Sequence, residues 1–180
     1  MFGRKKKEKA AADALFRGVS RKSDPSTGSP ADIVANAEKV VGSKKELAER
    51  LGVSERTVQR WASGDAKPRW GNAKKLKNFV RNDPDMRRAQ LSKHREARIR
   101  NQGSRIKVSG NMGVTAGGKK YRRHRTIETD LSPEAMGDIM DKWLAGNDDE
   151  ALDALREALG DEYVSGFELA DALESLEFKR

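Results

Sequence analysis

The stretch KKELAERLGVSERTVQRW (residues 44–61) decides the fold of the first half of this chain. Its apolar residues have the spacing of two short helices that pack against each other: Leu47, Ala48, Leu51, Val58 and Trp61. Between them, Gly52 accepts the positive φ of a tight turn, and Ser54 is a typical N-cap for the second helix. The small Ala48 side chain allows close approach of the two helices. The stretch therefore predicts a pair of crossed helices.

This spacing is typical of a helix-turn-helix, a motif that places its second helix in the major groove of DNA. The second helix would expose side chains that reach bases or phosphates, and the segment after it adds two cations. We predict DNA contacts from Ser54, Glu55, Arg56, Gln59, Arg60, Lys67 and Arg69. Helix pairs of this kind also occur in all-α domains that bind only protein. Trp61 fits the core, whereas Trp70 fits packing or a phosphate contact equally well.

Charge is divided unevenly along the chain. Residues 1–125 hold 33 Lys and Arg against 12 Asp and Glu, whereas residues 126–180 hold 4 against 16. A basic surface attracts polyanions, so nucleic acid is the expected partner of the first part, and protein is the expected partner of the acidic part. The acidic charge also has a simpler interpretation, which is solubility.

The chain has 180 residues and lacks cysteine, which excludes disulfides, zinc fingers and a thiol nucleophile. No segment has the length and apolarity of a membrane span or a signal peptide, so we expect an intracellular protein without a membrane partner. The two histidines, His94 and His124, are too few for a histidine-based metal site.

Hydrophobic periodicity predicts a mainly α fold with a small α+β part. Four segments are expected: a basic flexible N-terminus (1–29), a helix-turn-helix DNA-binding domain (30–82), a basic arm with a glycine-rich loop (83–125), and an acidic α+β interaction module (126–180). In the last, Ile127 and Leu131 alternate as in a strand, and Ser132 with Pro133 predicts the start of a helix.

The basic arm contains one acidic residue, Glu96, between residues 87 and 125. Within it, MRRAQLSKHREARIRNQ (residues 86–102) is predicted to be a helix. The arginines of such a helix would repel one another in isolation, so phosphate contact explains them better than simple solvation. The predicted phosphate contacts are Arg87, Arg88, Arg95, Arg98 and Arg100.

The nine residues GNMGVTAGG (110–118) place Thr115 among glycines, with basic residues on both sides. GVTAGGKK (113–120) partly satisfies the phosphate-binding loop of nucleotide hydrolases, but Lys120 stands where a magnesium-binding Ser or Thr is required. The following KKYRRHR is too polar for the buried helix of such a loop. His124, nine residues from Thr115, can be imagined as its base, but no orienting group for that base is visible, so we expect no self-sufficient active site and no enzyme activity.

The order of these parts resembles the Tpg family, the telomere-protecting terminal proteins of actinobacterial linear chromosomes and plasmids. The resemblance rests on LAERLGVSERTVQRW, the arginine-rich middle, the glycine-flanked GVTA, and the acidic end with LESLEF, and it extends from about Gly42 onward. The family implies a protein that is covalently attached to 5′ DNA ends and primes telomere end-filling from a threonine hydroxyl, here Thr115. Unlike the family's usual loop, this one has Met112 and Val114 and no aromatic residue before the threonine, which leaves Ser109 and Thr126 as alternatives.

The resemblance also implies the partners: telomeric DNA, a telomere-associated protein and a DNA polymerase. No cofactor belongs to the protein itself, since magnesium would act through the polymerase. The expected location is the cytoplasm, with the nucleoid at DNA ends. The alternative function is a helix-turn-helix transcriptional or plasmid-control regulator, which would bind palindromes as a dimer.

Overall fold

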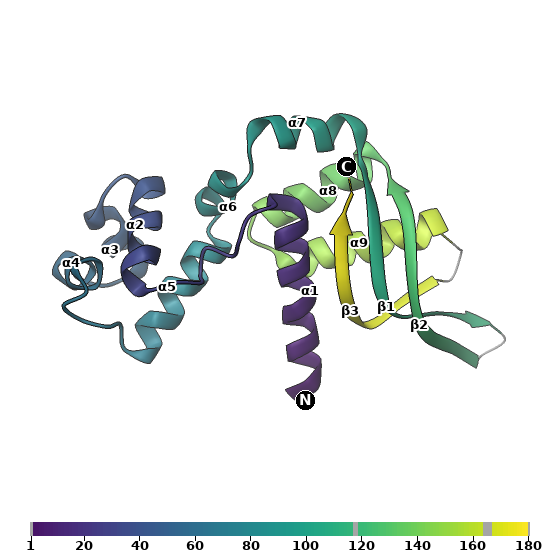
Figure 1. Cartoon of the computed structure of the whole chain (residues 1–180), viewed down its shortest axis with the longest axis horizontal. Helices are drawn as coiled ribbons and strands as arrows, with labels where there is room; N and C mark the ends of the chain where they lie inside the picture. The colour runs from purple at the N-terminus through teal and green to yellow at the C-terminus, as the bar shows by residue number, and fades with distance from the viewer. Residues whose placement is uncertain (1, 117–118, 164–166, 180) are drawn as a thin grey trace. The chain divides into compact units, whose positions relative to one another are not determined.

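A computed structural model describes residues 2–116, 119–163 and 167–179. Contacts within the chain divide it into two units, a helical unit (Ser23–Gln90) and a sheet unit (Met1–Lys22 with Leu91–Arg180). The fold is mainly α with a small sheet, so the predicted fold class is confirmed (Figure 1).

The helical unit has its own hydrophobic core. Its helices are α2 (Pro30–Val41), α3 (Lys44–Leu51), α4 (Glu55–Ser63), α5 (Trp70–Asn82) and α6 (Pro84–Gln90). Side chains such as Val34, Leu47, Val58 and Val80 are completely buried, and Trp61 is almost so. Trp61 therefore belongs to the core, as its position at helical spacing predicted.

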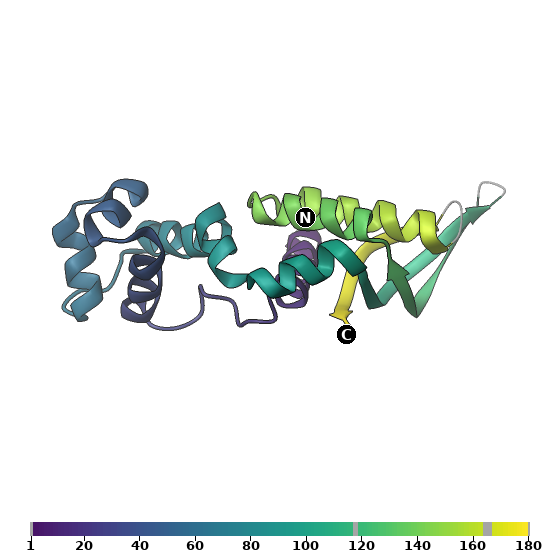
Figure 2. The same cartoon turned by 90° about the horizontal axis from the view of Figure 1, so that it is seen from above.

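The sheet unit combines a three-stranded antiparallel sheet with helices from both ends of the chain. Its elements are α1 (Phe2–Ser20), α7 (Lys93–Gln102), β1 (Ser104–Ala116), β2 (Lys119–Leu131), α8 (Pro133–Leu144), α9 (Asp148–Tyr163) and β3 (Phe167–Phe178). The strand order is β2-β1-β3, so β1 is the central strand. Helices α1 and α9 contact the sheet, and α8 packs on α9 (Figures 1 and 2).

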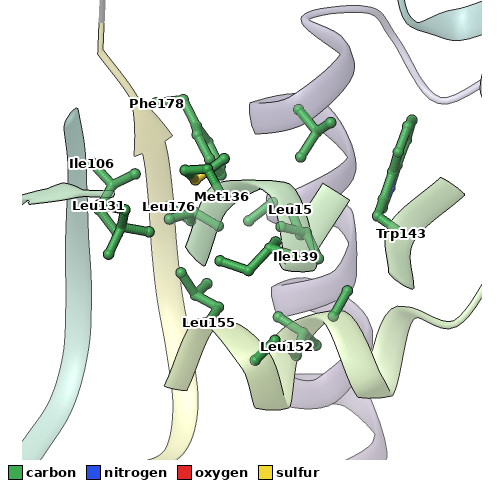
Figure 3. Packing of buried hydrophobic residues seen from close by; sticks show 14 of the residues in the cluster. Leu15, Ile106, Leu131, Met136, Ile139, Trp143, Leu152, Leu155, Leu176 and Phe178 are labelled. Atoms are coloured by element: carbon green, nitrogen blue, oxygen red, sulfur yellow. The ribbon is translucent and has the colours of Figure 1, made fainter. Parts of the chain in front are cut away.

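One face of the sheet supplies the core of this unit. Ile106, Leu131, Leu176 and Phe178 lie beside side chains of α1, α8 and α9 (Figure 3). Trp143 is fully buried and meets Phe16 of α1 edge-on, with ring centroids 5.5 Å apart. Burial of a large aromatic pair of this kind stabilises the packing of α1 on α8.

The N-terminal segment differs from the expected flexible basic tail. Residues 2–20 form α1, and its apolar face, including Leu15, Phe16 and Val19, is buried in the sheet unit. The sequence predicted a flexible segment here, because the partners of this face, from Leu91 onward, lie more than 70 residues away. The helix becomes stable through tertiary packing and not through its own propensity.

The middle of the chain also differs from expectation. The predicted single helix over residues 86–102 is broken at Leu91, which is buried, and Ser92, which caps α7 through a hydrogen bond from the backbone N–H of Arg95. The break separates the units, since α6 belongs to the helical unit and α7 to the sheet unit.

The acidic C-terminal part shares its sheet with the preceding basic strand. Strand β2 starts at Lys119, and β1 pairs with both β2 and β3. The boundary expected at residues 125/126 therefore falls inside a strand. Within β2, Ile127 and Leu131 are buried as their alternation predicted, and Ser132 caps α8 with Pro133 at its first position.

Candidate nucleic-acid interface

The turn between α3 and α4 has the geometry that its sequence predicts. Gly52 has φ 67° and ψ 42°, in the left-handed region, and the backbone N–H of Val53 donates to the carbonyl of Ala48 at 3.0 Å. Ser54 then caps α4 by accepting a hydrogen bond from the backbone N–H of Thr57 at 3.2 Å. With Val58 and Trp61 buried, these contacts fix the orientation of α4 on α3.

The outer face of α4 is polar and exposed. Glu55, Arg56, Gln59 and Arg60 are all exposed, on the side opposite the buried Val58. Gln59 Nε2 donates to Glu55 Oε1 at 3.1 Å. Among the described residues, Arg56 and Arg60 form no side-chain hydrogen bond or ion pair. Their guanidinium groups are thus available to an external acceptor, and guanidinium groups suit both guanine edges and phosphates.

Ser54 has a local role that the sequence also indicated. Its hydroxyl lies 2.8 Å from that of Thr57 and accepts a hydrogen bond from the backbone N–H of Thr57, in the first turn of α4. The side chain thus positions the helix.

A second cationic patch lies at the start of α5. Lys67, Arg69 and Trp70 are exposed, and 81% of the Trp70 surface is open, which excludes the packing role considered for it. Lys74 Nζ lies 5.7 Å from the Trp70 ring centroid, within cation–π range. A cleft of about 300 Å³ lies beside α4, and its lining includes Arg60, Lys67 and Arg69. The patch therefore extends the exposed face of α4.

One arginine of the expected basic arm has a structural role, which corrects its assignment as a phosphate contact. Arg87 is fully buried in the helical unit. Its Nε donates to the carbonyl of Arg81 at 2.8 Å, and its Nη2 donates to Asn82 Oδ1 at 2.9 Å. A buried guanidinium held in this way cannot reach DNA, whereas the neighbouring Arg88 is exposed.

Two further arginines of the arm are held by contacts inside the sheet unit. Arg95 donates through Nε and Nη2 to the carbonyls of Val19 and Gly18, at 2.6 and 2.7 Å, at the end of α1. Arg100 forms ion pairs with Glu96 at 3.2 Å and with Asp141 of α8 at 2.5 Å. Hydrogen bonding to Asp141 and Glu96 raises the pKa of Arg100 despite some burial.

The arm is therefore not one continuous phosphate-binding helix. Three of the predicted phosphate contacts lie in the sheet unit: Arg95, Arg98 and Arg100. Of these, Arg98 is exposed and forms no hydrogen bond or ion pair with another described residue. The sequence alone gave no sign of this difference, because the carbonyls that hold Arg95 and the Asp141 carboxylate that pairs with Arg100 are distant along the chain.

The glycine-rich segment is a strand over residues 110–116 and not the loop that the sequence predicted. Residues 110–116 continue β1 in regular pairing with β2, and Thr115 is in register with Lys120. Gly117 and Gly118 lie outside the described residues. Two isolated glycines, Gly110 and Gly113, are compatible with a strand when neighbouring strands supply the pairing, so tertiary context overrode the local preference.

The alternative hydroxyls lie in the middle of this strand pair. Ser109 and Thr126 are cross-strand partners, and their hydroxyl oxygens are 2.8 Å apart. Thr115 lies six residues further along β1, one residue before the strand ends. Figures 1 and 2 show this end of the β1–β2 hairpin extending past the helices of the sheet unit.

Comparison with known proteins identifies one part of the chain. Residues 42–84 match the protein family described as Helix-turn-helix, a range that begins at Gly42 and includes α3, α4 and α5. No curated protein and no solved structure matches the chain. No helix among the described residues is long and apolar enough to cross a membrane. Geometry and comparison agree that residues 42–84 form a helix-turn-helix domain of the kind that binds DNA.

Proposed function

We propose that this protein is a DNA-binding terminal protein, in which the helix-turn-helix holds the end of a linear DNA and Thr115 primes its replication. The sequence resemblance to the Tpg family supports this proposal. The observation that carries it furthest is the position of Thr115 near the end of a projecting hairpin, as a primer must enter the cleft of a polymerase.

The priming step needs chemistry that the protein does not supply alone. The Thr115 hydroxyl oxygen would attack the α-phosphorus of a deoxynucleoside triphosphate. A new oxygen–phosphorus bond forms, the bond to the β-phosphate oxygen breaks, pyrophosphate leaves, and the hydroxyl proton passes to a base or to solvent. The two magnesium ions of the polymerase would activate the oxygen and stabilise the leaving group. In this proposal the protein is a substrate and not an enzyme.

The basic strand β2 supports this route. Its sequence from Lys119 to Arg125 contains two lysines and three arginines beside the Thr115 end of β1. Such positive charge would help this end of the hairpin to enter the polymerase cleft along the path that a DNA phosphate backbone otherwise follows. The partners in this proposal are telomeric DNA, a telomere-associated protein and a DNA polymerase, at the nucleoid.

The test is transfer of a labelled deoxynucleotide to the purified chain by host extract or polymerase with magnesium. Thr115→Ala should abolish the labelling and preserve DNA binding, and Thr115→Ser should retain part of it. Ser109→Ala and Thr126→Ala are matched controls and should remain labelled. Because the tryptic peptide 108–119 contains both Ser109 and Thr115, fragmentation of the peptide must locate the nucleotide.

Undiminished labelling of Thr115→Ala would contradict the assignment, and loss of labelling in Ser109→Ala or Thr126→Ala alone would move it to that residue. Absence of labelling in the unmodified chain would favour the second function.

The second candidate is a regulator of transcription or plasmid maintenance. The family match over residues 42–84 favours it, since such domains commonly read operator DNA. A palindromic site with half-sites about one helical turn apart would support it, whereas a DNA-linked species that survives boiling in detergent would support the terminal protein.

A further inference from the structure

A cationic cleft lies in the sheet unit, and none of the residues that line it belongs to the helix-turn-helix. It has a volume of about 290 Å³ and is formed by the end of α1, by α7, by the start of β1 and by the residue after β3. The charged residues that line it are Arg21, Arg95, Arg98, Arg105, Asp130 and Lys179.

Positive charge exceeds negative charge in and around this cleft. Five cations line it with one carboxylate, Asp130. Glu128 is not among the lining residues but pairs with two of them, Lys179 and Arg105. Glu128 accepts a hydrogen bond from Lys179 at 2.5 Å and lies 3.8 Å from Arg105. The hydrogen bond from Lys179 is the main reason that the pKa of Glu128 is lowered. Even with both carboxylates ionised, a net positive charge of three remains.

Two of these arginines, Arg95 and Arg21, are held by neutral acceptors. Arg95 binds two carbonyls at the end of α1, and Arg21 Nη2 donates to the carbonyl of Phe178 at 3.3 Å. These bonds orient the guanidinium groups and leave their charge uncompensated. Burial, together with repulsion from Arg21 and Arg98, lowers the pKa of Arg95 to about 10. These cations repel one another, so a bound anion would stabilise the arrangement.

The backbone at Arg21 adopts an unfavourable conformation at the edge of the cleft. Arg21 is the non-glycine residue with a positive φ, 57°, in the described part of the chain. The left-handed conformation costs free energy for a side chain of this kind, and here it ends α1 at the cleft.

We propose that this cleft binds a phosphate group, supplied either by a nucleotide or by the backbone of a nucleic acid. Planar guanidinium groups bind phosphate oxygens through paired charge-assisted hydrogen bonds, and several converge here. The site goes beyond the proposed function and does not depend on it. Ser104, which lines the cleft, and Thr115 lie at opposite ends of β1, with 11 residues of strand from one to the other, so the cleft is not the priming position.

The test is calorimetric titration of the full chain with pyrophosphate, with a deoxynucleoside triphosphate and with a 12-nucleotide single strand. Arg98→Gln removes an exposed cation without breaking a hydrogen bond to a described residue, and it should weaken binding about tenfold. Arg156→Gln is the matched control, since Arg156 lies on α9 outside the cleft and pairs with Asp153. The Arg156→Gln variant should bind the same ligands with an affinity close to that of the unmodified chain.

The three ligands distinguish the two sources of phosphate. Binding of pyrophosphate or the triphosphate, weakened by Arg98→Gln, identifies a nucleotide-type ligand. Binding of the single strand alone, with the same weakening, identifies the backbone. Failure of all three to bind, or equal weakening by Arg156→Gln, would overturn the proposal.

A variant in the helix-turn-helix separates this site from the proposed function. Arg56→Ala should leave pyrophosphate binding unchanged, because Arg56 lies in the other unit. Circular dichroism of Arg98→Gln should match that of the unmodified chain, and Arg98→Glu should weaken binding further.

Discussion

At the residue scale, two arginines of the helix-turn-helix show how surroundings decide a role. Arg50 on α3 is held by Glu46 at 2.9 Å and Asp85 at 2.8 Å, with Asp83 at 3.5 Å. Hydrogen bonds to Asp85 and Glu46 raise the pKa of its guanidinium. Arg56 on α4 forms no such contact with a described residue. The two side chains carry the same charge, but Arg50 is already paired with carboxylates. Only Arg56 is therefore available to an external partner.

Arg56→Ala should relax sequence preference, at a cost of about 1 to 3 kcal/mol on the preferred duplex, because a base contact is lost there and not on random DNA. Arg50→Ala is the control: it should lower stability by about 1 kcal/mol or less and leave sequence preference unchanged. Fluorescence anisotropy on preferred and random duplexes would measure both. Equal losses on the two duplexes for Arg56→Ala would remove α4 from the reading role.

Arg87 and Arg88 form a second pair, adjacent in sequence and opposite in exposure. Arg87→Ala should destabilise the helical unit by about 2 to 4 kcal/mol, because two acceptors lose their donor and a cavity forms. Arg88→Ala should change stability by about 0.5 kcal/mol or less. Urea unfolding measures the difference, and equal midpoints for the two variants would contradict the structural role of Arg87.

At the scale of elements, the junction between α7 and β1 depends on Gly103. Its φ is 66°, and a Cβ added there would lie 2.1 Å from the carbonyl oxygen of Leu131, at the end of β2. The close approach holds the start of β1 against the end of β2, where Ser104 pairs with Leu131. The register of the strand pair therefore begins at a position that admits only glycine.

Gly103→Ala should destabilise the sheet unit by about 2 to 4 kcal/mol, through backbone strain and the clash. Gly71→Ala is a suitable control, since a Cβ there meets nothing within 4 Å. Thermal unfolding followed by circular dichroism would compare them. A Gly103→Ala protein as stable as Gly71→Ala would show that the junction can move to accommodate the methyl group.

At the scale of the whole molecule, the two units do not coincide with the basic and acidic parts of the sequence. The helical unit has 14 Lys and Arg against 9 Asp and Glu, and the sheet unit has 23 against 19. Basic α7 and acidic α8 are joined by the Arg100–Asp141 pair, and Lys179 and Lys107 both face Glu128 on the sheet. The acidic residues thus partly neutralise their own unit and do not form a separate module.

This division predicts the behaviour of fragments. Residues 23–90 alone should unfold cooperatively and bind DNA, since their core is self-contained. A chain that ends at Arg125 should keep this transition but lose the fold of the sheet unit, because it lacks Ile139, Trp143 and the whole of β3. Limited proteolysis would show one protected fragment within residues 23–90. Protection of residues 91–125 in the shortened chain would contradict the prediction.

The sequence by itself determined the helix-turn-helix, the exposed face of α4, the strand at Ile127 and the start of α8. All of these depend on residues within about ten positions of one another: the spacing of Leu47 and Leu51, the turn at Gly52, and the caps at Ser54 and Ser132. Local preference and final structure agree there, so local reasoning was sufficient.

Only the tertiary structure decided the rest. It buried α1 against β3, extended β1 through the glycines to Ala116, and directed Arg87 inward. It also brought Arg21, Arg98 and Lys179 to one cleft. The physical reason is that these outcomes depend on contacts between residues far apart in the sequence, whose burial and pairing outweigh weak local preferences of less than about 1 kcal/mol per residue.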